Sequence, residues 1–210
     1  MNNQRAILDS HPGYLRPYVR AVARHGGGFG SLLWSSPQTQ AARFDALVRI
    51  ADMQGSKLLD AGCGRADLLV FLMAREIFPS EYVGVEAVPE LQDIARSTVE
   101  EYPGARIVAA DFVSDPESLN VGTDVAIFCG SLNTLDPFAF EVVLRRVYAT
   151  VRSGVVFNFL SSPDRAAASH LTWHRPQRVV SFARSISRTV RTLEGYLDGD
   201  CTVGIFKDGQ

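Results

Sequence analysis

Residues 57–68 read KLLDAGCGRADL, and this stretch decides the fold. The apolar run that starts at Leu58 predicts a buried strand, and a helical pattern begins at Ala66. Gly62 and Gly64 lie between them, where glycine lets the backbone turn tightly and approach a ligand closely. The helix that follows presents unpaired N–H groups and a partial positive charge at its first turn. The stretch therefore predicts a strand, a glycine turn and a helix that together hold an anionic or strongly polar group.

A carboxylate ends the next predicted strand. Residues 82–86 read YVGVE, and Glu86 lies 22 residues after Gly64. In sheets built from alternating strands and helices, an acid at the end of the second strand accepts hydrogen bonds from ribose hydroxyls. NAD, FAD and S-adenosylmethionine all carry such a ribose. The spacing thus predicts a nucleoside cofactor without choosing among these three.

Two acidic residues near the turn distinguish between these cofactors. The dinucleotide fingerprint is G-x-G-x-x-G, and Asp67 stands at the position of its third glycine. A carboxylate there is unfavourable for a pyrophosphate, and Asp60, just before the turn, is equally ill suited to one. Asp60 instead suits a ligand that carries an ammonium group, such as the methionine part of S-adenosylmethionine.

Three motifs taken together resemble those of the class I S-adenosylmethionine-dependent methyltransferases. They are LDAGCG at residues 59–64, Glu86, and ADF at residues 110–112. The resemblance covers roughly residues 40–207. It departs from the family at Ala66, where many members have a third glycine, and we expect this substitution to be mild. The resemblance implies S-adenosyl-L-methionine as the cofactor and a Rossmann-like three-layer α/β sandwich.

The resemblance also implies a role for each motif residue. Asp60 and the glycine turn would hold the methionine end, Glu86 the ribose, and Asp111 the adenine amino group, with Phe112 stacked on the ring. Arg43 would pair with the cofactor carboxylate, because a guanidinium binds carboxylates bidentately. The alternatives are a solvated Arg43 and an Asp111 that only caps residues 114–119. The predicted cofactor-binding residues are Arg43, Asp60, Gly62, Cys63, Gly64, Glu86, Ala87, Asp111, Phe112, Cys129 and Gly130.

The end of the chain predicts the sheet topology. Residues 189–193 and 201–206 read as two strands, and the connection over residues 194–200 is so short that they must be antiparallel. An antiparallel last strand beside the fifth is typical of the class I methyltransferase sheet, whereas a dinucleotide-binding sheet is normally parallel. We expect seven strands in the order 3-2-1-4-5-7-6. Helices are expected from Pro37, over 68–78, from Pro89, from Pro137 and over 176–184.

We divide the chain into an N-terminal helical extension, residues 1–35, and a cofactor-binding domain, residues 36–210. A helix is predicted over residues 14–24, and the glycine-rich HGGGFG follows at residues 25–30. A phosphate loop needs a preceding strand and a Gly-Lys-Ser/Thr sequence, and this stretch has neither, so it is interpreted as a connector. Such extensions often close the site in the family, so we expect a lid. Trp34 either lines the site or packs.

Candidate substrate residues follow the fourth and fifth predicted strands. Residues 129–133 come directly after the fourth strand, and ligands bind outside the carboxyl ends of parallel strands. Asn133 is assigned to the substrate, with a turn-forming role as the alternative. His170 and His174 lie in a polar connection and are candidate substrate residues or general bases, with surface positions as the alternative. No third metal ligand accompanies them, so no metal is predicted, and no catalytic residue is assigned.

Composition sets further bounds. The chain has 210 residues, of which 46% are hydrophobic and 21% charged, and its formal net charge is -2. These values are ordinary for one α/β domain and give no field that favours nucleic acid or an anionic membrane. No apolar run approaches the roughly 20 residues that span a bilayer. The 3 cysteines are far apart and odd in number, which predicts neither disulfides nor zinc and favours a reducing, cytoplasmic setting.

These observations predict a methyltransferase that moves a methyl group directly, in line, from S-adenosylmethionine to a small molecule. The sulfonium is already activated as a leaving group, so orientation can supply roughly 7–11 kcal/mol and a general base is optional. An RNA methyltransferase is less favoured, because the charge is near neutral and no recognition domain is appended. A non-catalytic cofactor-binding protein predicts an occluded or apolar site at residues 129–133. An NAD-dependent oxidoreductase predicts a parallel sixth strand.

Overall fold

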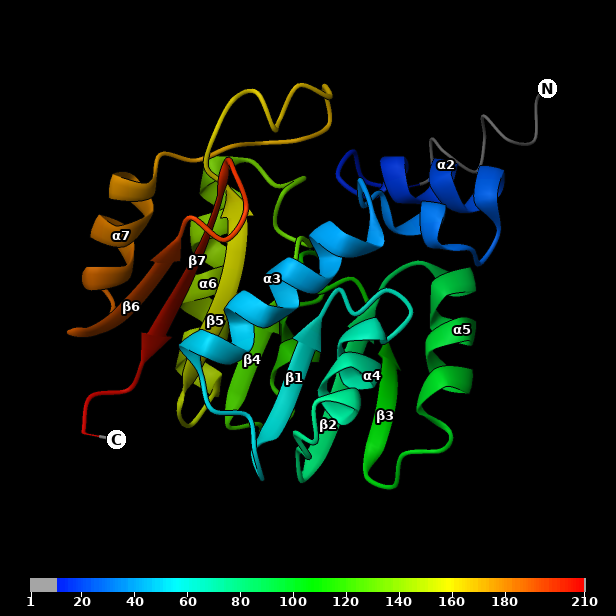
Figure 1. The fold of residues 1–210 in the computed structure, drawn as a ribbon, viewed down its shortest axis with the longest axis horizontal. Coiled ribbons are helices and arrows are strands. Elements are labelled where there is room, and N and C mark those ends of the chain that lie inside the picture. The colour runs from blue at the N-terminus through cyan, green and yellow to red at the C-terminus, as the bar shows by residue number, and fades with distance from the viewer. Residues whose placement is uncertain (1–10, 210) are drawn as a thin grey trace.

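A seven-stranded sheet forms the centre of the computed structural model, which describes residues 11–209 (Figure 1). The strands are β1 (Lys57–Ala61), β2 (Glu81–Glu86), β3 (Ala105–Ala109), β4 (Val125–Phe128), β5 (Gly154–Leu160), β6 (Thr189–Glu194) and β7 (Asp200–Phe206). Their order is β3-β2-β1-β4-β5-β7-β6. Strands β1 to β5 pair in parallel, and β7 lies antiparallel between β5 and β6. The predicted order and the antiparallel last strand are confirmed.

Helices cover both faces of the sheet, as the predicted three-layer sandwich requires. The core on one face is formed with α3 (Pro37–Ile50), α4 (Asp67–Ala74) and α5 (Pro89–Val99). The core on the other face is formed with α6 (Pro137–Thr150), α7 (Pro176–Arg184) and the short 3-10 helix η2 (Pro116–Leu119). Two N-terminal elements, α2 (Arg16–His25) and η1 (Phe29–Leu32), pack beside the start of α5. Residues 1–10 of the predicted extension lie outside the described residues.

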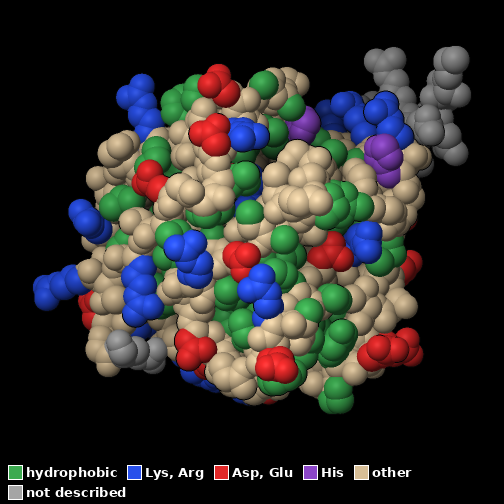
Figure 2. Space-filling model, in the orientation of Figure 1, with side chains coloured by type: hydrophobic (Ala, Val, Ile, Leu, Met, Phe, Trp, Pro, Cys, Tyr) green, Lys and Arg blue, Asp and Glu red, His purple; other side chains and the backbone are tan. Residues whose placement is uncertain are grey.

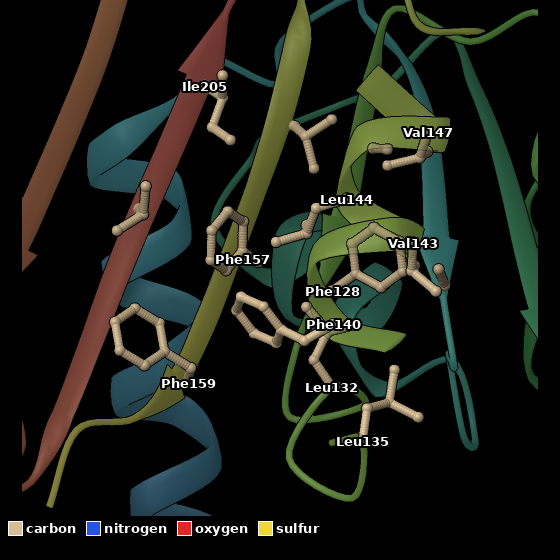
Figure 3. Close-up of a cluster of buried hydrophobic side chains, with 14 of the residues drawn as sticks. Phe128, Leu132, Leu135, Phe140, Val143, Leu144, Val147, Phe157, Phe159 and Ile205 are labelled. Atoms are coloured by element: carbon tan, nitrogen blue, oxygen red, sulfur yellow. The ribbon is translucent and has the colours of Figure 1, made fainter. Parts of the chain in front are cut away.

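Strand β5 shows how the sequence divides its side chains between these two cores. Phe157 and Phe159 belong to the core on the α6 side, whereas Val156 belongs to the core on the α3 side. Successive side chains of a strand point to opposite faces, so a continuous apolar run serves both layers. Figure 3 shows Phe140 of α6 packed against this strand, with its ring centroid 5.6 Å from that of Phe157.

Helix α3 begins where the sequence predicts. The Ser36 hydroxyl accepts a hydrogen bond from the Thr39 amide at 3.2 Å, and the Thr39 hydroxyl accepts one from the Ser36 amide at 3.2 Å. This reciprocal cap satisfies two amides that the first turn would otherwise leave unpaired, and Pro37 fits the first helical position. The cap fixes where α3 starts, directly before the carboxyl edge of the sheet.

Helix α4 ends earlier than predicted. The sequence predicts a helix over residues 68–78, but α4 stops at Ala74. The amides of Glu76 and Ile77 turn back to carbonyl oxygens three and five residues earlier, at 3.0 Å each. This is a Schellman ending, which needs a left-handed residue, and Glu76 supplies it with φ of 58°. A glutamate at this position gave no sequence signal for the stop.

The sheet has its switch point at the centre. Strand β1 pairs with β2 on one side and with β4 on the other, so the order of strands reverses between β1 and β4. Ligands of open α/β sheets bind in the crevice outside the carboxyl ends of the strands at such a point. The glycine turn after β1 therefore lies where a ligand is expected.

Candidate functional site

The turn after β1 has left-handed backbone at three positions. Gly62, Gly64 and Ala66 have φ of 75°, 58° and 61°. A Cβ at residue 62 would lie 2.5 Å from the Cβ of Ser131, so only glycine fits there. Ala66 is fully buried and carries a Cβ in a conformation that costs roughly 1–2 kcal/mol. The expectation that Ala66 is a mild departure is therefore wrong, because its backbone is the kind that glycine favours.

Glu86 is held by three backbone amides at the end of β2. One carboxylate oxygen accepts from the Gly64 amide at 2.8 Å, and the other accepts from the Ala87 and Val88 amides at 2.9 Å each. The side chain is only 6% exposed. Burial raises the pKa of Glu86 to about 7, although the three amide donors act in the opposite direction. The predicted acid thus closes the glycine turn and still lines the cavity beside it.

Asp60 lies at the base of the same cavity. Its carboxylate accepts a hydrogen bond from the Tyr82 hydroxyl at 2.6 Å and is 2% exposed. Burial raises the pKa of Asp60 to about 7, and the nearby carboxylates of Glu86 and Asp67 add to this effect, against the hydrogen bond from Tyr82. Two acids with raised pKa values in one cleft are typical of a functional site.

Asp111 receives a hydrogen bond from the N-terminal segment. The Tyr14 hydroxyl donates to its carboxylate at 2.7 Å, and burial followed by this contact raises the pKa of Tyr14. The same carboxylate accepts from the Ser114 hydroxyl and the Val113 amide. Asp111 therefore caps the turn after β3, which was the alternative role, and also lines the cavity with Phe112.

One cavity joins these residues at the carboxyl ends of β1, β2 and β4. It encloses about 820 Å³ of empty space, open solvent at its mouth included. Nine of the eleven predicted cofactor-binding residues line it, and these are Asp60, Gly62, Cys63, Gly64, Glu86, Ala87, Asp111, Phe112 and Cys129.

The charged side chains that line the cavity are all acidic. Four carboxylates line it, those of Asp60, Asp67, Glu86 and Asp111, and among residues 11–209 no Lys, Arg or His does. The Gln40 amide also reaches it and donates to Asp67 at 3.0 Å. A cleft of one sign of charge with apolar walls attracts ligands of the opposite charge.

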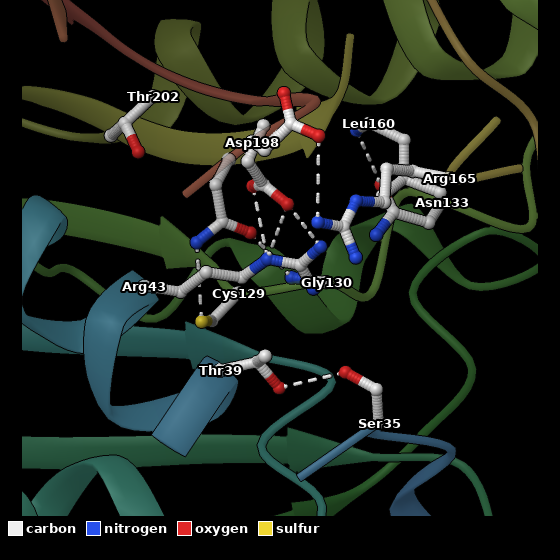
Figure 4. A network of polar contacts seen from close by, with 12 residues as sticks. Ser35, Thr39, Arg43, Cys129, Gly130, Asn133, Leu160, Arg165, Asp198 and Thr202 are labelled. Carbon is white, nitrogen blue, oxygen red and sulfur yellow. Dashed lines mark hydrogen bonds and ion pairs between the residues drawn. The ribbon is translucent and has the colours of Figure 1, made fainter. Parts of the chain in front are cut away.

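Arg43 has a different role from the predicted one. Its guanidinium forms a buried ion pair with Asp200 of β7, with Nε 2.9 Å from each carboxylate oxygen. The Tyr196 hydroxyl completes the network by donating to Asp200 at 2.9 Å. Figure 4 shows Arg43 reaching from α3 towards Cys129 and Gly130. Arg43 does not line the cavity and is not a solvated surface residue, so it joins α3 to the last strand.

Two predicted residues near β4 and β5 are structural. The side-chain oxygen of Asn133 accepts from the Leu160 amide at 3.3 Å, and the residue is 5% exposed. Gly130 does not line the cavity, and its amide donates to the Asn158 side chain at 2.9 Å. These bonds tie the loop after β4 to strand β5. The alternative of a turn-forming Asn133 describes the structure better than a substrate role.

The two candidate histidines lie apart from the cavity and from each other. His174 is buried against Phe140, with ring centroids 4.3 Å apart, and burial lowers its pKa to about 4. His170 faces a second cavity beside α2. Among the described residues, no cluster of His, Cys, Asp or Glu could hold a metal ion. No helix within residues 11–209 is long and apolar enough to cross a membrane.

Several residues of the N-terminal segment line the cavity although the sequence did not predict them. Tyr14 and Tyr18 line the cavity, and burial, with the charge of Glu86, raises the pKa of Tyr18 to about 12. Trp34, for which two roles were open, lines it as well. The only available signal was the pattern that predicted a helix over residues 14–24, but α2 starts at Arg16, so Tyr14 lies in the turn before the helix and Tyr18 within it.

No protein-family model matches this sequence, and no curated protein matches it. Solved structures do match. Magnesium protoporphyrin IX methyltransferase (ChlM) of Synechocystis PCC 6803, with bound SAH, has a TM-score of 0.60 and 11% identity, covering 99% of this chain and 94% of its own. The CcbJ methyltransferase of Streptomyces caelestis has a TM-score of 0.62 and 13% identity, covering 90% and 96%.

The methyltransferase domain of bacterial CtHen1-CN also matches, with a TM-score of 0.62 and 17% identity over 79% of this chain and 98% of that domain. The chain has the class I methyltransferase fold. The antiparallel β7 is part of this methyltransferase fold. At 11% to 17% identity the likeness concerns the fold, so the reaction has to be argued from the cavity.

Proposed function

We propose that this chain is an S-adenosylmethionine-dependent methyltransferase that acts on a small molecule. The observation that carries the proposal is the acidic cavity at the switch point, which four carboxylates line without any basic side chain from residues 11–209. S-adenosylmethionine carries a sulfonium and an ammonium group, so it fits this charge. The diphosphate of NAD is negatively charged and does not fit. An oxidoreductase was also expected to have a parallel sixth strand, whereas β7, the sixth strand in the sheet, is antiparallel to β5.

The residues that line the cavity suit the parts of this cofactor. Asp60 would accept from the ammonium group, and the left-handed glycine turn leaves room for the methionine chain. Glu86 would accept from the ribose hydroxyls, because each carboxylate oxygen can take more than one hydrogen bond. Asp111 and Phe112 would hold the adenine. Gln40 replaces Arg43 as the proposed partner of the cofactor carboxylate, since it lines the cavity and its amide, which donates one hydrogen bond to Asp67, has a second N–H to donate.

We propose that the N-terminal segment is a lid, as expected for residues 1–35. Tyr14, Leu15 and Tyr18 line the cavity on its outer side, and the Tyr14 hydroxyl already reaches Asp111. A cover of this kind excludes water and orients the ligand. The bound cofactor supplies an electrophilic methyl group. The cavity offers no basic side chain among the described residues, so orientation is the main contribution of the chain.

Thermal unfolding with added ligands tests the cofactor. S-adenosylmethionine, S-adenosylhomocysteine and NAD are each added at millimolar concentration to the full chain. A ligand at 100 times its dissociation constant stabilises by about 2.7 kcal/mol, which gives a clear rise in Tm for a domain of this size. The proposal expects a rise with both adenosyl ligands and none with NAD. A rise with NAD alone, or with none of the three, contradicts it.

A non-catalytic cofactor-binding protein is the second candidate. Two polar side chains of the loop after β4 are already used: the Ser131 hydroxyl donates to the Ala61 carbonyl at 2.6 Å, and Asn133 is bonded to Leu160. Incubation with radiolabelled S-adenosylmethionine and separate small-molecule, RNA and protein fractions of a cell extract distinguishes the two. Label in the small-molecule fraction supports the enzyme, label only in RNA or protein corrects the substrate class, and no label favours the second candidate.

A further inference from the structure

A second cavity lies beside α2, between this helix and the turn at Ser169–His170. It has about 1690 Å³ of empty space, open solvent included. Its charged and imidazole side chains are Arg20, Arg24, His25, His170 and Glu90. We call this cavity the α2 groove. The charge of its lining is opposite to that of the cofactor cavity, because among the described residues it includes two arginines, two histidines and only one acid.

The arginines of the α2 groove are available for a ligand. Arg20 and Arg24 are exposed, one turn apart on α2, and neither has an ion-pair partner among residues 11–209. Figure 2 shows basic side chains and histidines gathered on the upper right of the molecule, where Figure 1 places α2. Two guanidinium groups one turn apart can bind the same carboxylate or phosphate.

The glycine-rich stretch fixes one wall of the α2 groove. A Cβ at Gly30 would lie 2.9 Å from the Cγ of His25, so the glycine leaves room for the imidazole ring. A Cβ at Gly27 would lie 2.3 Å from the Cδ1 of Ile94, so this glycine lets the turn dock against α5. The glycine-rich residues 25–30, which lack a phosphate-loop motif, therefore place His25 beside the two arginines.

A strained turn connects the α2 groove to the cofactor cavity. Leu33 has φ of 59° and ψ of 18°, which is left-handed and unusual for leucine. Leu33 is 38% exposed and lines the groove, whereas the next residue, Trp34, lines the cofactor cavity. A Cβ at Gly130, directly after β4, would lie 3.1 Å from the Trp34 ring. Backbone strain of this kind persists where the surrounding structure holds it and often marks a functional site.

We propose that the α2 groove binds an anionic group, a carboxylate or phosphate, of the small molecule that accepts the methyl group. The acceptor would be held by its charged end at Arg20 and Arg24, with its nucleophilic end directed past Trp34. This inference deepens the proposed function and rests on it. Each cavity would then bind one of the two substrates: the acidic cavity binds the cationic cofactor, and the basic groove binds the anionic acceptor.

Calorimetric titration of the full chain tests the proposal. Citrate, tripolyphosphate and a hexauridylate RNA are titrated separately into protein with and without saturating S-adenosylhomocysteine. The small anions are expected to bind, and the Arg20→Gln, Arg24→Gln double variant is expected to lose at least about tenfold in affinity, because two charge-assisted contacts are removed. The matched control is Arg49→Gln with Arg184→Gln, which removes the same charge from exposed arginines outside the groove. It is expected to change the affinity less than about twofold.

Three outcomes overturn the proposal: no binding of either small anion to the native chain, equal losses in the two double variants, or much tighter binding of the RNA than of tripolyphosphate. Affinity for S-adenosylhomocysteine, measured in the same variants, is expected to stay unchanged and shows that they fold. His170→Gln gives a second, milder test, with an expected loss smaller than that of the double variant. Anion binding that fails while S-adenosylhomocysteine binds removes only this inference, whereas failure of S-adenosylhomocysteine to bind removes the proposed function.

Discussion

Burial raises the pKa values of Asp60 and Glu86 well above their ordinary range. Both pKa values are about 7 in the folded chain, against ordinary values of 3.8 and 4.5. Between those values and about pH 7 the folded chain keeps protons that the unfolded chain releases. The contribution of these groups to stability is therefore present at low pH and is lost as the pH rises through this window. A bound cation would reverse this balance by favouring the ionised carboxylates.

Cofactor affinity is expected to depend on pH for this reason. Because the protonated acids must ionise to hold a cation, the dissociation constant for S-adenosylmethionine should fall as the pH rises from 5.5 to 7.5. The change is at most about tenfold per pH unit for each group. Calorimetry in buffers of different ionisation enthalpy should show proton release on binding. Asp60→Asn should flatten the profile, and a native profile that is already flat contradicts this account.

Glu86→Ala should weaken S-adenosylmethionine binding by well over about tenfold, which corresponds to a loss of more than about 1.4 kcal/mol. The physical reason is the loss of the ribose acceptor together with the three amides that it organises. Fluorescence titration measures the affinity, and the Tm of the free variant separates a binding defect from unfolding. Glu100→Ala, an exposed acid at the C-terminal end of α5 and outside the cavity, is the control. Unchanged affinity in Glu86→Ala removes this residue from the ribose role.

Motif residues could be predicted from the sequence because their neighbours along the chain determine their positions. Asp60, Glu86 and Asp111 each lie at or just after the carboxyl end of a strand, and parallel strands bring such positions to one edge. Arg43 could not be assigned in this way, because its partner Asp200 is 157 residues away. The roles of Asn133 and His174 likewise depend on contacts between distant segments, with Leu160 and Phe140 respectively.

At the scale of elements, the start of a helix is often determined by the residues next to it in the sequence. Ser36 and Asp136 cap α3 and α6 with their side chains, and both helices start with proline as predicted. Helix α4 is the exception, because its ending uses a left-handed glutamate, Glu76, for which no sequence rule gives a stop.

Glu76→Gly is expected to raise the free energy of unfolding by about 0.5–1 kcal/mol, because glycine takes left-handed backbone without strain. Urea unfolding of the two chains measures the difference. Ala74→Gly, two residues earlier and the last residue of α4, is the matched control and should lower the free energy of unfolding by up to about 1 kcal/mol. A loss of stability in both variants would show that the Schellman ending does not strain Glu76.

At the scale of the whole molecule, the short connection between the last two strands predicted that they are antiparallel, and the family resemblance implied the strand order. No motif in residues 11–34 predicted their placement, because a helix without a motif can pack at many places on a sheet, and the expectation of a lid came from the resemblance alone. The structure puts this segment over the cofactor cavity, where Tyr14 and Tyr18 take part in its lining.

Bound cofactor should protect α2 from trypsin. Cleavage after Arg20 or Arg24 requires α2 to leave the cavity, and a cofactor that contacts Tyr18 opposes this opening. At 100 times the dissociation constant, cleavage in α2 should slow by up to about 100-fold. Mass spectrometry of the fragments measures the rate, with cleavage after the exposed Arg188 as the internal reference. Equal slowing at both places would indicate global stabilisation without a lid.

The ion pair between Arg43 and Asp200 also bears on how the protein is made. Strand β7 fills the gap between β5 and β6, and among the strands of residues 11–209 it leaves the ribosome last. Until then β5 has an open edge, and the guanidinium of α3 lacks the carboxylate that neutralises it. A nascent chain can therefore complete the sheet only after residues 200–206 have been synthesised. A chain arrested before these residues would keep an exposed strand edge and an unpaired buried charge, and we expect chaperones and proteases to bind it.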